Sequence, residues 1–320
     1  MAGTLEQRPF GNTGEKVTVI GLGGAFLYKH SFEQGVETVK HALELGVNYF
    51  DTSPAYGRQR DGKWISRGES QLIMGEGLDG STKPHLLATK LHKCRSVEDF
   101  RAQIQENLHA LRRDRVDILQ AHDIEWAYLW KPDTHFWKPD RQSTDMLNLN
   151  EELDFEKAPV IQAMREAKKQ GLCRFIGISS QWSEMIVHVL KHVKLDMCLS
   201  AMEYSLRNRR SPHVVLPFTR EQGVAYVIGG IFSVKGAVGE AFSEERLLKL
   251  AETTGMSIAT LTVRFLIANQ EISTILVGAS TPEEIEESVV AAQAGPLPSD
   301  LIRSLEELGS NTGYYENLVG

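Results

Sequence analysis

The sequence predicts an α/β protein with the architecture of a (β/α)8 TIM barrel, and three observations support this. Eight short apolar runs have the composition of buried strands. Longer segments with helical periodicity lie between most of them. The 320 residues are also enough for one large barrel. We therefore expect a single domain over residues 1–320.

The strand candidates are apolar runs of four to seven residues. They are VTVIGLG (17–23), VNYF (47–50), HLLAT (85–89), VDILQ (116–120), RFIGI (174–178), MCLS (197–200), VAYVI (224–228) and STILVG (273–278). Strands that alternate with helices pair in parallel, so a closed barrel and an open doubly wound sheet both fit. GLGGAF (21–26) lacks the GxGxxG spacing of dinucleotide-binding sheets, which favours the barrel.

Four segments between the strands have the periodicity or end signals of helices. They are 32–45, 97–111, 159–171, which begins with Pro159 and ends at Gly171, and 282–292, which begins with Pro282. Two further helices, near 256–269 and 299–309, exceed the strict alternation. RPFGNTGEKVTV (8–19) is typical of a hairpin that closes the barrel floor. A long irregular stretch at about 122–157 indicates a functional loop.

Composition excludes several functional classes. A net charge of −7 and a pI near 5.8 argue against a nucleic-acid partner. The three cysteines, Cys94, Cys173 and Cys198, form no CxxC pair, so we expect neither a disulfide framework nor a metal site. The first residues lack a signal-peptide pattern, and no run is long enough to span a bilayer. We expect a cytoplasmic protein without a membrane partner, and leave open whether it forms a homo-oligomer.

Polar residues at the carboxyl ends of barrel strands point into the active site of such folds. Here they are Asp51, Tyr56, Lys90 and His122. A lysine cation near a phenol would lower the phenol pKa, an aspartate would hold the lysine, and a histidine would bind a substrate oxygen. Each residue alone is more often structural, but together they indicate hydride transfer coupled to proton transfer. That chemistry requires a nicotinamide.

The stretches NYFDTSPAYG, LLATKL and VDILQAHDIEW resemble the aldo-keto reductase superfamily. RFIGIS, GVAYVIGG and TILVGASTPEEIEESVVAA extend the resemblance over nearly the whole chain, and HDIE and ANQEISTILVGAS are most similar to the L-galactose and D-arabinose dehydrogenase branch. The resemblance implies a (β/α)8 barrel, a nicotinamide cofactor, and a catalytic tetrad of Asp51, Tyr56, Lys90 and His122, in which Tyr56 gives or takes the proton.

The resemblance also implies a set of cofactor-binding positions. These are Gly24, Asp51, Ser179, Ser180, Glu203, Tyr226, Gly278, Ser280, Thr281, Glu284, Glu287 and Ser288. Tyr226 is expected to stack on the nicotinamide, while Ser180, Glu203 and Ser288 replace the asparagine, glutamine and asparagine usual in the family. The segment after the last strand carries Glu283 and Glu284 and no basic residue, so NAD is favoured over NADP.

The substrate is predicted to be a sugar or sugar derivative, because aromatic faces stack on sugar C–H faces. The aromatic candidates are Trp64, Trp126, Trp130 and Trp137. Three alternatives stay open: an NADPH-dependent aldehyde or ketone reductase, a nucleotide-binding barrel without catalysis, and an aldolase-like role for Lys90 as a Schiff-base lysine.

Overall fold

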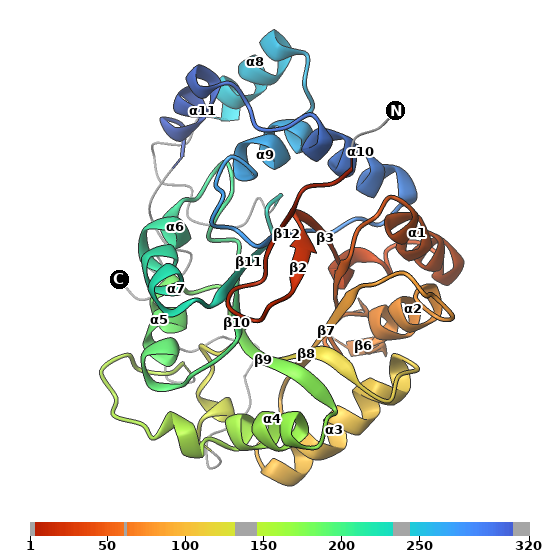
Figure 1. Cartoon of the computed structure of the whole chain (residues 1–320), viewed down its shortest axis with the longest axis vertical. Helices are drawn as coiled ribbons and strands as arrows, with labels where there is room; N and C mark the ends of the chain where they lie inside the picture. Colours follow the sequence, from red (N-terminus) through yellow and green to blue (C-terminus); the bar gives the residue numbers. More distant parts are fainter. Residues whose placement is uncertain (1–3, 61–62, 132–145, 233–243, 310–320) are drawn as a thin grey trace.

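The computed structural model describes residues 4–60, 63–131, 146–232 and 244–309. Eight parallel strands close into a barrel in the order β3, β4, β7, β8, β9, β10, β11, β12, which confirms the predicted fold (Figure 1). Their bounds are β3 Ile20–Gly23, β4 Tyr49–Asp51, β7 Leu86–Leu91, β8 Val116–His122, β9 Cys173–Ser180, β10 Met197–Ala201, β11 Ala225–Gly229 and β12 Thr274–Val277.

Helices surround the barrel (Figure 1). Those after β3 to β9 are α1 Phe32–Glu44, α2 Glu69–Gly77, α3 Val97–Ala110, α4 Pro159–Lys169 and α5 Ser183–His192. Those after β10 to β12 are α6 Arg210–Val214, α7 Leu216–Gln222, α8 Glu244–Thr254, α9 Ile258–Leu266, α10 Pro282–Gln293 and α11 Ser299–Glu306. Figure 1 shows α8 and α11 outside α9, so these two helices are additional to the alternation of strands and helices. The helix predicted near 256–269 is α9, which belongs to the ring of helices around the barrel.

Helix ends follow local capping chemistry. The Ser31 side chain accepts from the Gln34 N–H at the start of α1, and Ser96 and Asp99 form a reciprocal capping box at the start of α3. Thr281 caps α10, and Pro282 follows it at the first helical position. Side chains of the helices and the outer strand faces make one large hydrophobic core, and a second, smaller core fills the barrel interior.

An N-terminal hairpin closes one end of the barrel, as predicted. Its strands β1 Gln7–Pro9 and β2 Lys16–Thr18 are antiparallel, so Val17 and Thr18 belong to the hairpin and not to the first barrel strand. Phe10 is fully buried in the interior core, with its ring 5.5 Å from that of Tyr49. The Arg8 guanidinium donates to the carbonyls of Ile267, Asn269 and Ile272, which ties the hairpin to the end of α9.

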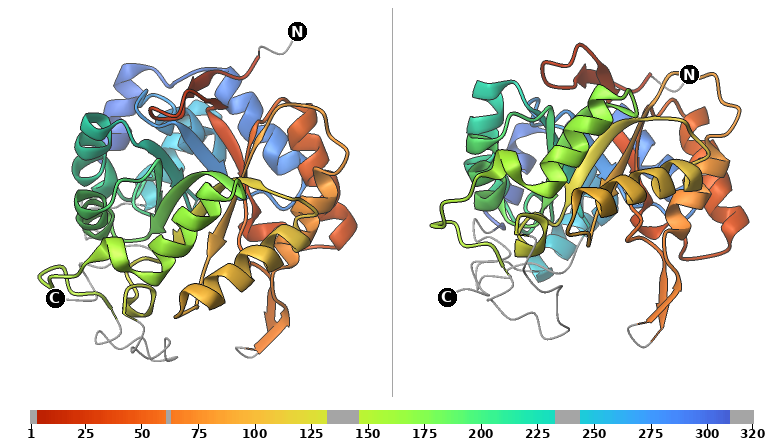
Figure 2. Two further views of the ribbon diagram at one scale, coloured as in Figure 1. Left: turned by 60° about the horizontal axis from the view of Figure 1, so that its bottom comes forward. Right: turned by 90° about the horizontal axis from the view of Figure 1, so that it is seen from below.

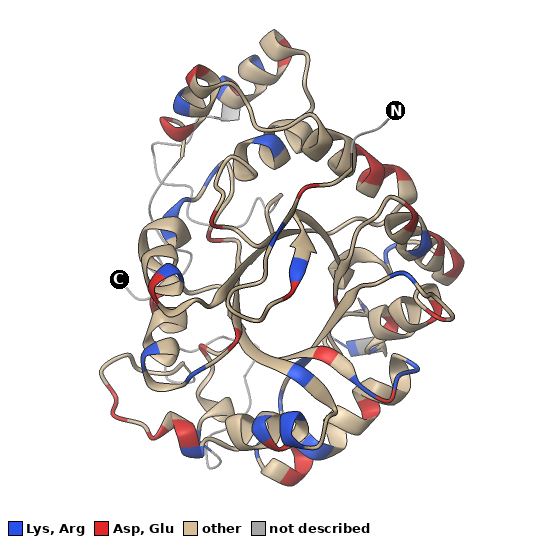
Figure 3. Ribbon diagram, viewed as in Figure 1, with Lys and Arg blue, Asp and Glu red and all other residues tan. Residues whose placement is uncertain are grey.

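A second hairpin, formed by β5 Arg58–Arg60 and β6 Lys63–Ser66, was not predicted. Figure 2 shows that it projects from the end of the barrel opposite β1 and β2. Of the loop predicted at 122–157, the structure describes both ends, with η2 Ala127–Leu129, η4 Phe155–Lys157 and a bridge between Trp126 and Met146. Figure 3 shows charges of both signs interspersed over the outer helices.

Candidate active site

A cavity of about 310 Å³ opens at the carboxyl ends of the barrel strands. Asp51 and Tyr56 form part of its wall, and most of the remaining lining is apolar or glycine. The rest of the lining is Gly23, Gly24, Ala25, Phe26, Leu199, Ala201, Met202, Gly229, Gly230, Ile231, Phe232, Leu276 and Gly278. Residues from β3, β4, β10, β11 and β12 thus converge on one apolar space beside a carboxylate and a phenol.

Lys90 lies at the centre of a buried polar cluster. Its side chain pairs with Asp51, and its Nζ also donates to the Thr52 carbonyl at 2.9 Å. The side chains of Lys90 and Asp51 are 1% and 3% exposed. Gln120 Nε2 donates to the other Asp51 carboxylate oxygen at 2.7 Å. Charges this deeply buried are stable only when paired and hydrogen-bonded, and here both conditions hold.

Tyr56 follows a tight turn after β4, in which its N–H donates to the Ser53 carbonyl at 3.1 Å. Lys90 Nζ lies 4.9 Å from the centre of the Tyr56 ring, and the His122 ring meets it edge to face at 5.7 Å. The structure therefore brings together all four predicted residues, Asp51, Tyr56, Lys90 and His122. The sequence placed Lys90 and His122 just beyond β7 and β8, but both strands continue to include them.

The pKa of Tyr56 shifts in the direction opposite to the one that the sequence predicted. Burial, followed by the Asp51 carboxylate, raises the pKa of Tyr56 well above its ordinary value, so the net shift is opposite to the predicted lowering. Burial also lowers the pKa of Lys90, although Asp51 opposes this effect. At neutral pH the phenol is therefore protonated.

His122 ends β8 and contacts polar groups on two sides. Its Nδ1 lies 3.2 Å from the Ser53 hydroxyl, and its Nε2 lies 3.5 Å from an Asp123 carboxylate oxygen. Burial, and then the Lys90 charge, lower the pKa of His122 well below the ordinary histidine value. The imidazole is therefore neutral at pH 7, and one of its nitrogens carries a proton that can be donated.

Tyr226 and Glu203 are among the predicted cofactor residues that do not reach the cavity. Tyr226 is buried on the outer face of β11, where its hydroxyl bonds to Ser211 of α6, so its predicted stacking on a nicotinamide is wrong. Side chains alternate along the strand, and the cavity-lining residue at its end is Gly229. Glu203 is likewise enclosed, with bonds from the Ser183 hydroxyl and the Asn208 amide.

Ser179 and Ser180 end β9, but neither lines the cavity. The Ser179 hydroxyl lies 3.4 Å from the Ala121 carbonyl, and the Ser180 hydroxyl donates to the buried Glu125 carboxylate at 2.7 Å. The sequence did not single out Ala201, Met202 and Ile231, which do line the cavity. Continuing the alternation of β10 and β11 by two residues would have found Ala201 and Ile231.

The start of α10 is arranged around Glu284. Its carboxylate accepts from the Ser280 N–H at 2.6 Å and from the Ser280 hydroxyl at 2.9 Å. Glu287 pairs with Ser257 at the start of α9, and the buried Ser288 donates to the Glu284 carbonyl. Of the positions predicted here, Gly278 lines the cavity, whereas Ser280, Thr281 and Glu284 lie just beyond it.

Trp126 and Trp130, the two predicted substrate tryptophans whose side chains the structure describes, do not line the cavity. Trp130 is buried, its indole N–H donates to the Ile124 carbonyl at 2.7 Å, and its ring packs on Phe155. Trp126 is also buried, so the structure contradicts a substrate role for both. Trp64 lies on β6, and its side chain is not among those described; Trp137 lies outside the described residues.

Comparison with known proteins agrees with this geometry. The model of the Aldo/keto reductase family matches residues 19–310. L-galactose dehydrogenase of Arabidopsis thaliana is 30% identical over 314 residues, covering 90% of this chain and 88% of that protein. D-threo-aldose 1-dehydrogenase of a Pseudomonas species is 21% identical, covering 87% and 88%. The holo form of aldo-keto reductase AKR11C1 from Bacillus halodurans superposes with a TM-score of 0.71 at 22% identity, covering 97% and 98%.

The closed parallel barrel is a TIM barrel, with an apolar cavity beside a buried lysine–aspartate pair, and the family match makes the protein a TIM-barrel oxidoreductase. The chain belongs to the aldo/keto reductase family. In the described part of the chain, no helix has the length and apolar character that crossing a bilayer requires.

Proposed function

We propose that this protein transfers a hydride between a nicotinamide cofactor, NAD(P), and a sugar or sugar-derived alcohol or carbonyl. The observation that carries the proposal is the position of Tyr56. Its ring forms a wall of the cavity, and the buried Lys90–Asp51 pair lies directly behind it. This arrangement resembles the proton-transfer site of a dehydrogenase more than a packing cluster, because buried charges are costly to maintain without a function.

The cavity suits a flat ring system. A Cβ at Gly229 would lie 3.7 Å from Leu199 and 3.9 Å from Leu276, so a side chain there would fill the space between these two cavity walls. A Cβ at Gly278 would lie 2.7 Å from the Phe26 ring. Glycines at both positions support the binding of a nicotinamide beside Asp51 and Tyr56. When bound, the nicotinamide supplies or accepts the hydride.

The chain's own residues handle the proton. In the proposed mechanism, the Tyr56 hydroxyl gives a proton to the substrate oxygen during reduction and takes it back during oxidation. The Ser53 hydroxyl accepts from the Ala55 N–H at 3.1 Å and lies 3.2 Å from His122 Nδ1, to which it donates in this mechanism. The ring proton of His122 then lies on Nε2 and is donated to the same substrate oxygen. Lys90 stabilises negative charge that develops on Tyr56.

NAD is the preferred cofactor in this proposal. The Ser280 N–H and hydroxyl, near the start of α10, are already bound by the Glu284 carboxylate. A 2′-phosphate near this carboxylate would be repelled, and Glu283 adds a second negative charge in the first turn. Asp51, Gly24 and Gly278 would lie against the nicotinamide half, because all three line the cavity.

The substrate class rests on the curated relatives and on the cavity rim. Two relatives bear the names L-galactose dehydrogenase and D-threo-aldose 1-dehydrogenase. Phe26 and Phe232 line the cavity and are 54% and 41% exposed. Exposed aromatic faces at a cavity mouth stack on the C–H faces of sugars. These two rings replace Trp126 and Trp130 as the proposed aromatic contacts.

The test is a titration of the protein with NADH and NADPH by cofactor fluorescence, followed by turnover of a sugar panel by the wild type and Tyr56→Phe. We expect tighter binding of NADH, and a loss of turnover in Tyr56→Phe with cofactor binding retained. Tyr49→Phe is the matched control, since the buried Tyr49 hydroxyl has no hydrogen-bond partner among the described residues. Equal turnover in the two variants would overturn the proposal.

A second candidate is an NADPH-dependent reductase of aldehydes or ketones. The observation in its favour is that Tyr56, whose pKa burial raises well above its ordinary value, is protonated at neutral pH, which is the state in which a phenol gives a proton to a carbonyl oxygen. Tighter binding of NADPH, with faster reduction than oxidation, would favour it. Binding of either cofactor without turnover would indicate a nucleotide-binding barrel without catalysis.

A further inference from the structure

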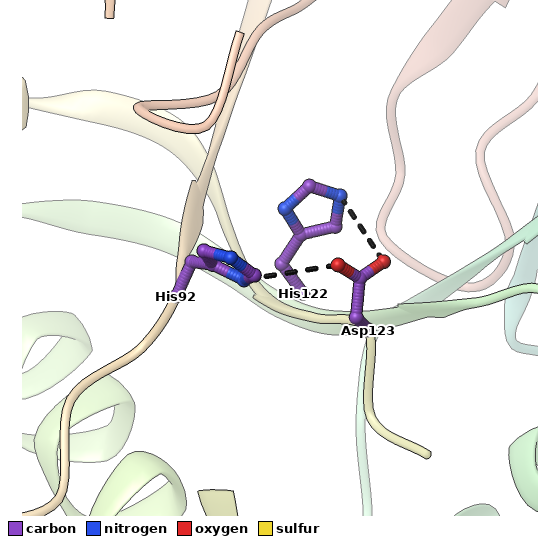
Figure 4. A group of neighbouring side chains, drawn as sticks. All are labelled: His92, His122 and Asp123. Carbon is purple, nitrogen blue, oxygen red and sulfur yellow. Dashed lines mark ion pairs between the residues drawn. The ribbon is translucent and has the colours of Figure 1, made fainter. Parts of the chain in front are cut away.

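Two histidines and an aspartate meet at the carboxyl ends of β7 and β8. His92 directly follows β7, His122 ends β8, and Asp123 follows His122. One Asp123 oxygen lies 3.7 Å from His92 Nδ1 and the other lies 3.5 Å from His122 Nε2 (Figure 4). Donor atoms of the three residues all lie within 4.8 Å of one another. No local sequence pattern indicates this group, because His92 precedes His122 by 30 positions and Asp123 by 31.

We propose that His92, His122 and Asp123 form a binding site for a divalent transition-metal ion, with Zn²⁺ as the ion of choice. Imidazole and carboxylate donors suit zinc better than calcium or magnesium. Zinc binds nitrogen and oxygen at about 2.0–2.2 Å, so tetrahedral donors lie roughly 3.3 Å apart. The distances of 3.5 and 3.7 Å from the two Asp123 oxygens are close to this value, and the widest separation in the group, up to 4.8 Å, has to shorten by side-chain rotation when an ion binds.

The backbone holds the first two ligands in place. Gln103 of α3 binds His92 at both main-chain groups, accepting from its N–H at 2.7 Å and donating to its carbonyl at 2.9 Å. The Tyr128 hydroxyl lies 3.3 Å from His92 Nδ1, the nitrogen that faces Asp123, so this contact has to give way when an ion binds. His122 is fixed by its strand and by Ser53 on the far side of its ring. Supporting contacts of this kind orient ligands in metal sites.

Asp123 is the ligand with the least ordinary backbone. Its φ of 55° lies in the left-handed region, which aspartate adopts more readily than most residues but still at a cost. In this conformation its carboxylate faces both imidazoles instead of only one (Figure 4). Its side chain is 23% exposed, against 10% for His92 and 11% for His122, so an ion can arrive from solvent on the Asp123 side.

Three cations act electrostatically on the imidazoles, which limits the affinity. Lys93 and Arg67 act on His92, and Lys90 acts on His122. Asp123 provides one opposing charge within the site. We therefore expect a reversible site that fills and empties with the free zinc concentration, and not a permanently occupied structural centre.

An ion at this site would inhibit the proposed reaction, and this consequence rests on the proposed function. Hydrogen-bond donation to a substrate oxygen needs the ring proton of His122 on Nε2. Metal binding needs a lone pair on that same nitrogen, with the proton on Nδ1 facing the Ser53 oxygen. One nitrogen cannot serve both purposes, so zinc and substrate are expected to compete.

The test measures metal binding directly, without turnover. Zn²⁺ affinity is obtained by competition with a chromophoric chelator, and Co²⁺ absorption spectra report the coordination geometry. We expect one Zn²⁺ per chain at this site, with binding weakened roughly tenfold or more in both His92→Ala and Asp123→Asn. The control is His41→Ala, because His41 lies on the surface within 3.3 Å of Glu286 and 3.9 Å of Glu44.

Unchanged Zn²⁺ affinity in both His92→Ala and Asp123→Asn would show that these residues do not bind the ion. An equal loss of Zn²⁺ affinity in His41→Ala would show the same. Circular dichroism verifies folding, and Asp123→Asn, which keeps the side-chain shape, decides the matter if His92→Ala does not fold. Zinc inhibition is then compared with each variant's own metal-free rate, and inhibition not relieved by substrate would contradict the competition. If no substrate turns over, the proposed function fails. The Co²⁺ spectrum alone then shows whether His92, His122 and Asp123 bind a metal ion.

Discussion

Lys90 and Asp51 form an ion pair that is almost completely closed off from solvent, with side chains 1% and 3% exposed. Removing one member would leave a buried charge without its opposite, which typically costs about 3–5 kcal/mol. We therefore expect Lys90→Met to lower the free energy of unfolding by about that amount. The double variant Asp51→Asn/Lys90→Met should recover much of the loss, because no unpaired charge remains. Urea denaturation measures both.

Lys168→Met is the control for these two variants, because Lys168 Nζ pairs with Asp196 at 2.7 Å near the surface and the Lys168 side chain is 41% exposed. A surface pair contributes about 0–1 kcal/mol. A double variant that is less stable than Lys90→Met would contradict the argument.

Gln120 is predicted to position Asp51. Its Nε2 donates to the Asp51 carboxylate at 2.7 Å, while its own carbonyl oxygen has no partner among the described residues. In Gln120→Leu we expect stability to fall by about 1.5–3 kcal/mol, as for hydrogen bonds to charged groups, and kcat to fall roughly tenfold. Gln71→Leu is the matched comparison, because Gln71 donates to Thr89 at 2.9 Å in equal burial. Gln71→Leu should lower stability without lowering kcat. A similar fall in kcat in Gln71→Leu would show that Gln120 has no special role in positioning Asp51.

Glu284 is predicted to disfavour NADP. In Glu284→Ala, the Ser280 N–H and hydroxyl lose their carboxylate partner and become free to bind a phosphate oxygen. We expect the ratio of NADPH to NADH affinity to rise about tenfold, which corresponds to about 1.4 kcal/mol. Fluorescence titration of both cofactors measures it. Glu286→Ala, on the same helix but facing His41, should leave the ratio unchanged.

Glu284 also has a predictable effect on the pH dependence of stability. Partial burial raises its pKa, but hydrogen bonds from the Ser280 N–H and hydroxyl outweigh burial and leave the pKa below the ordinary glutamate value. A group with a lowered folded pKa stabilises the protein above its unfolded pKa, near 4.3, and loses this contribution as the pH falls through the folded value. Glu284→Gln should therefore be less stable than the wild type at pH 7. Denaturation curves that still differ at about pH 2 would contradict this.

Gly24 and Gly278 both border the cavity, yet alanine should have different effects at the two positions. A Cβ at Gly24 would lie 2.3 Å from the Ser70 hydroxyl and 3.1 Å from the Asp51 carbonyl, both in fully packed surroundings. We expect Gly24→Ala to cost about 1–3 kcal/mol and to reduce turnover. At Gly278 the clash is with Phe26, which is 54% exposed and free to move. Gly278→Ala should cost less; thermal unfolding curves that show equal losses would contradict this explanation.

The fold and the four-residue cluster could be predicted because their signals are local. Apolar runs that end in a polar residue identified Asp51, Lys90 and His122, although their catalytic roles stay predictions. The errors have physical reasons. Which face of β11 carries Tyr226 depends on where the strand ends, and moving that end by one residue exchanges the two faces. The burial of Trp130 depends on a bond to the Ile124 carbonyl, which no local pattern encodes.

The β1–β2 hairpin has a further consequence. Because Phe10 fills the lower end of the barrel and Arg8 ties the hairpin to α9, that end is sealed. The cavity opens at the other end, where the strands finish. In the part of the chain that the structure describes, the cavity therefore opens at one end, and whichever ligand lies deeper must arrive first and leave last. A cofactor against Asp51 would bind before its substrate and depart after the product, so initial-rate kinetics should follow an ordered sequence.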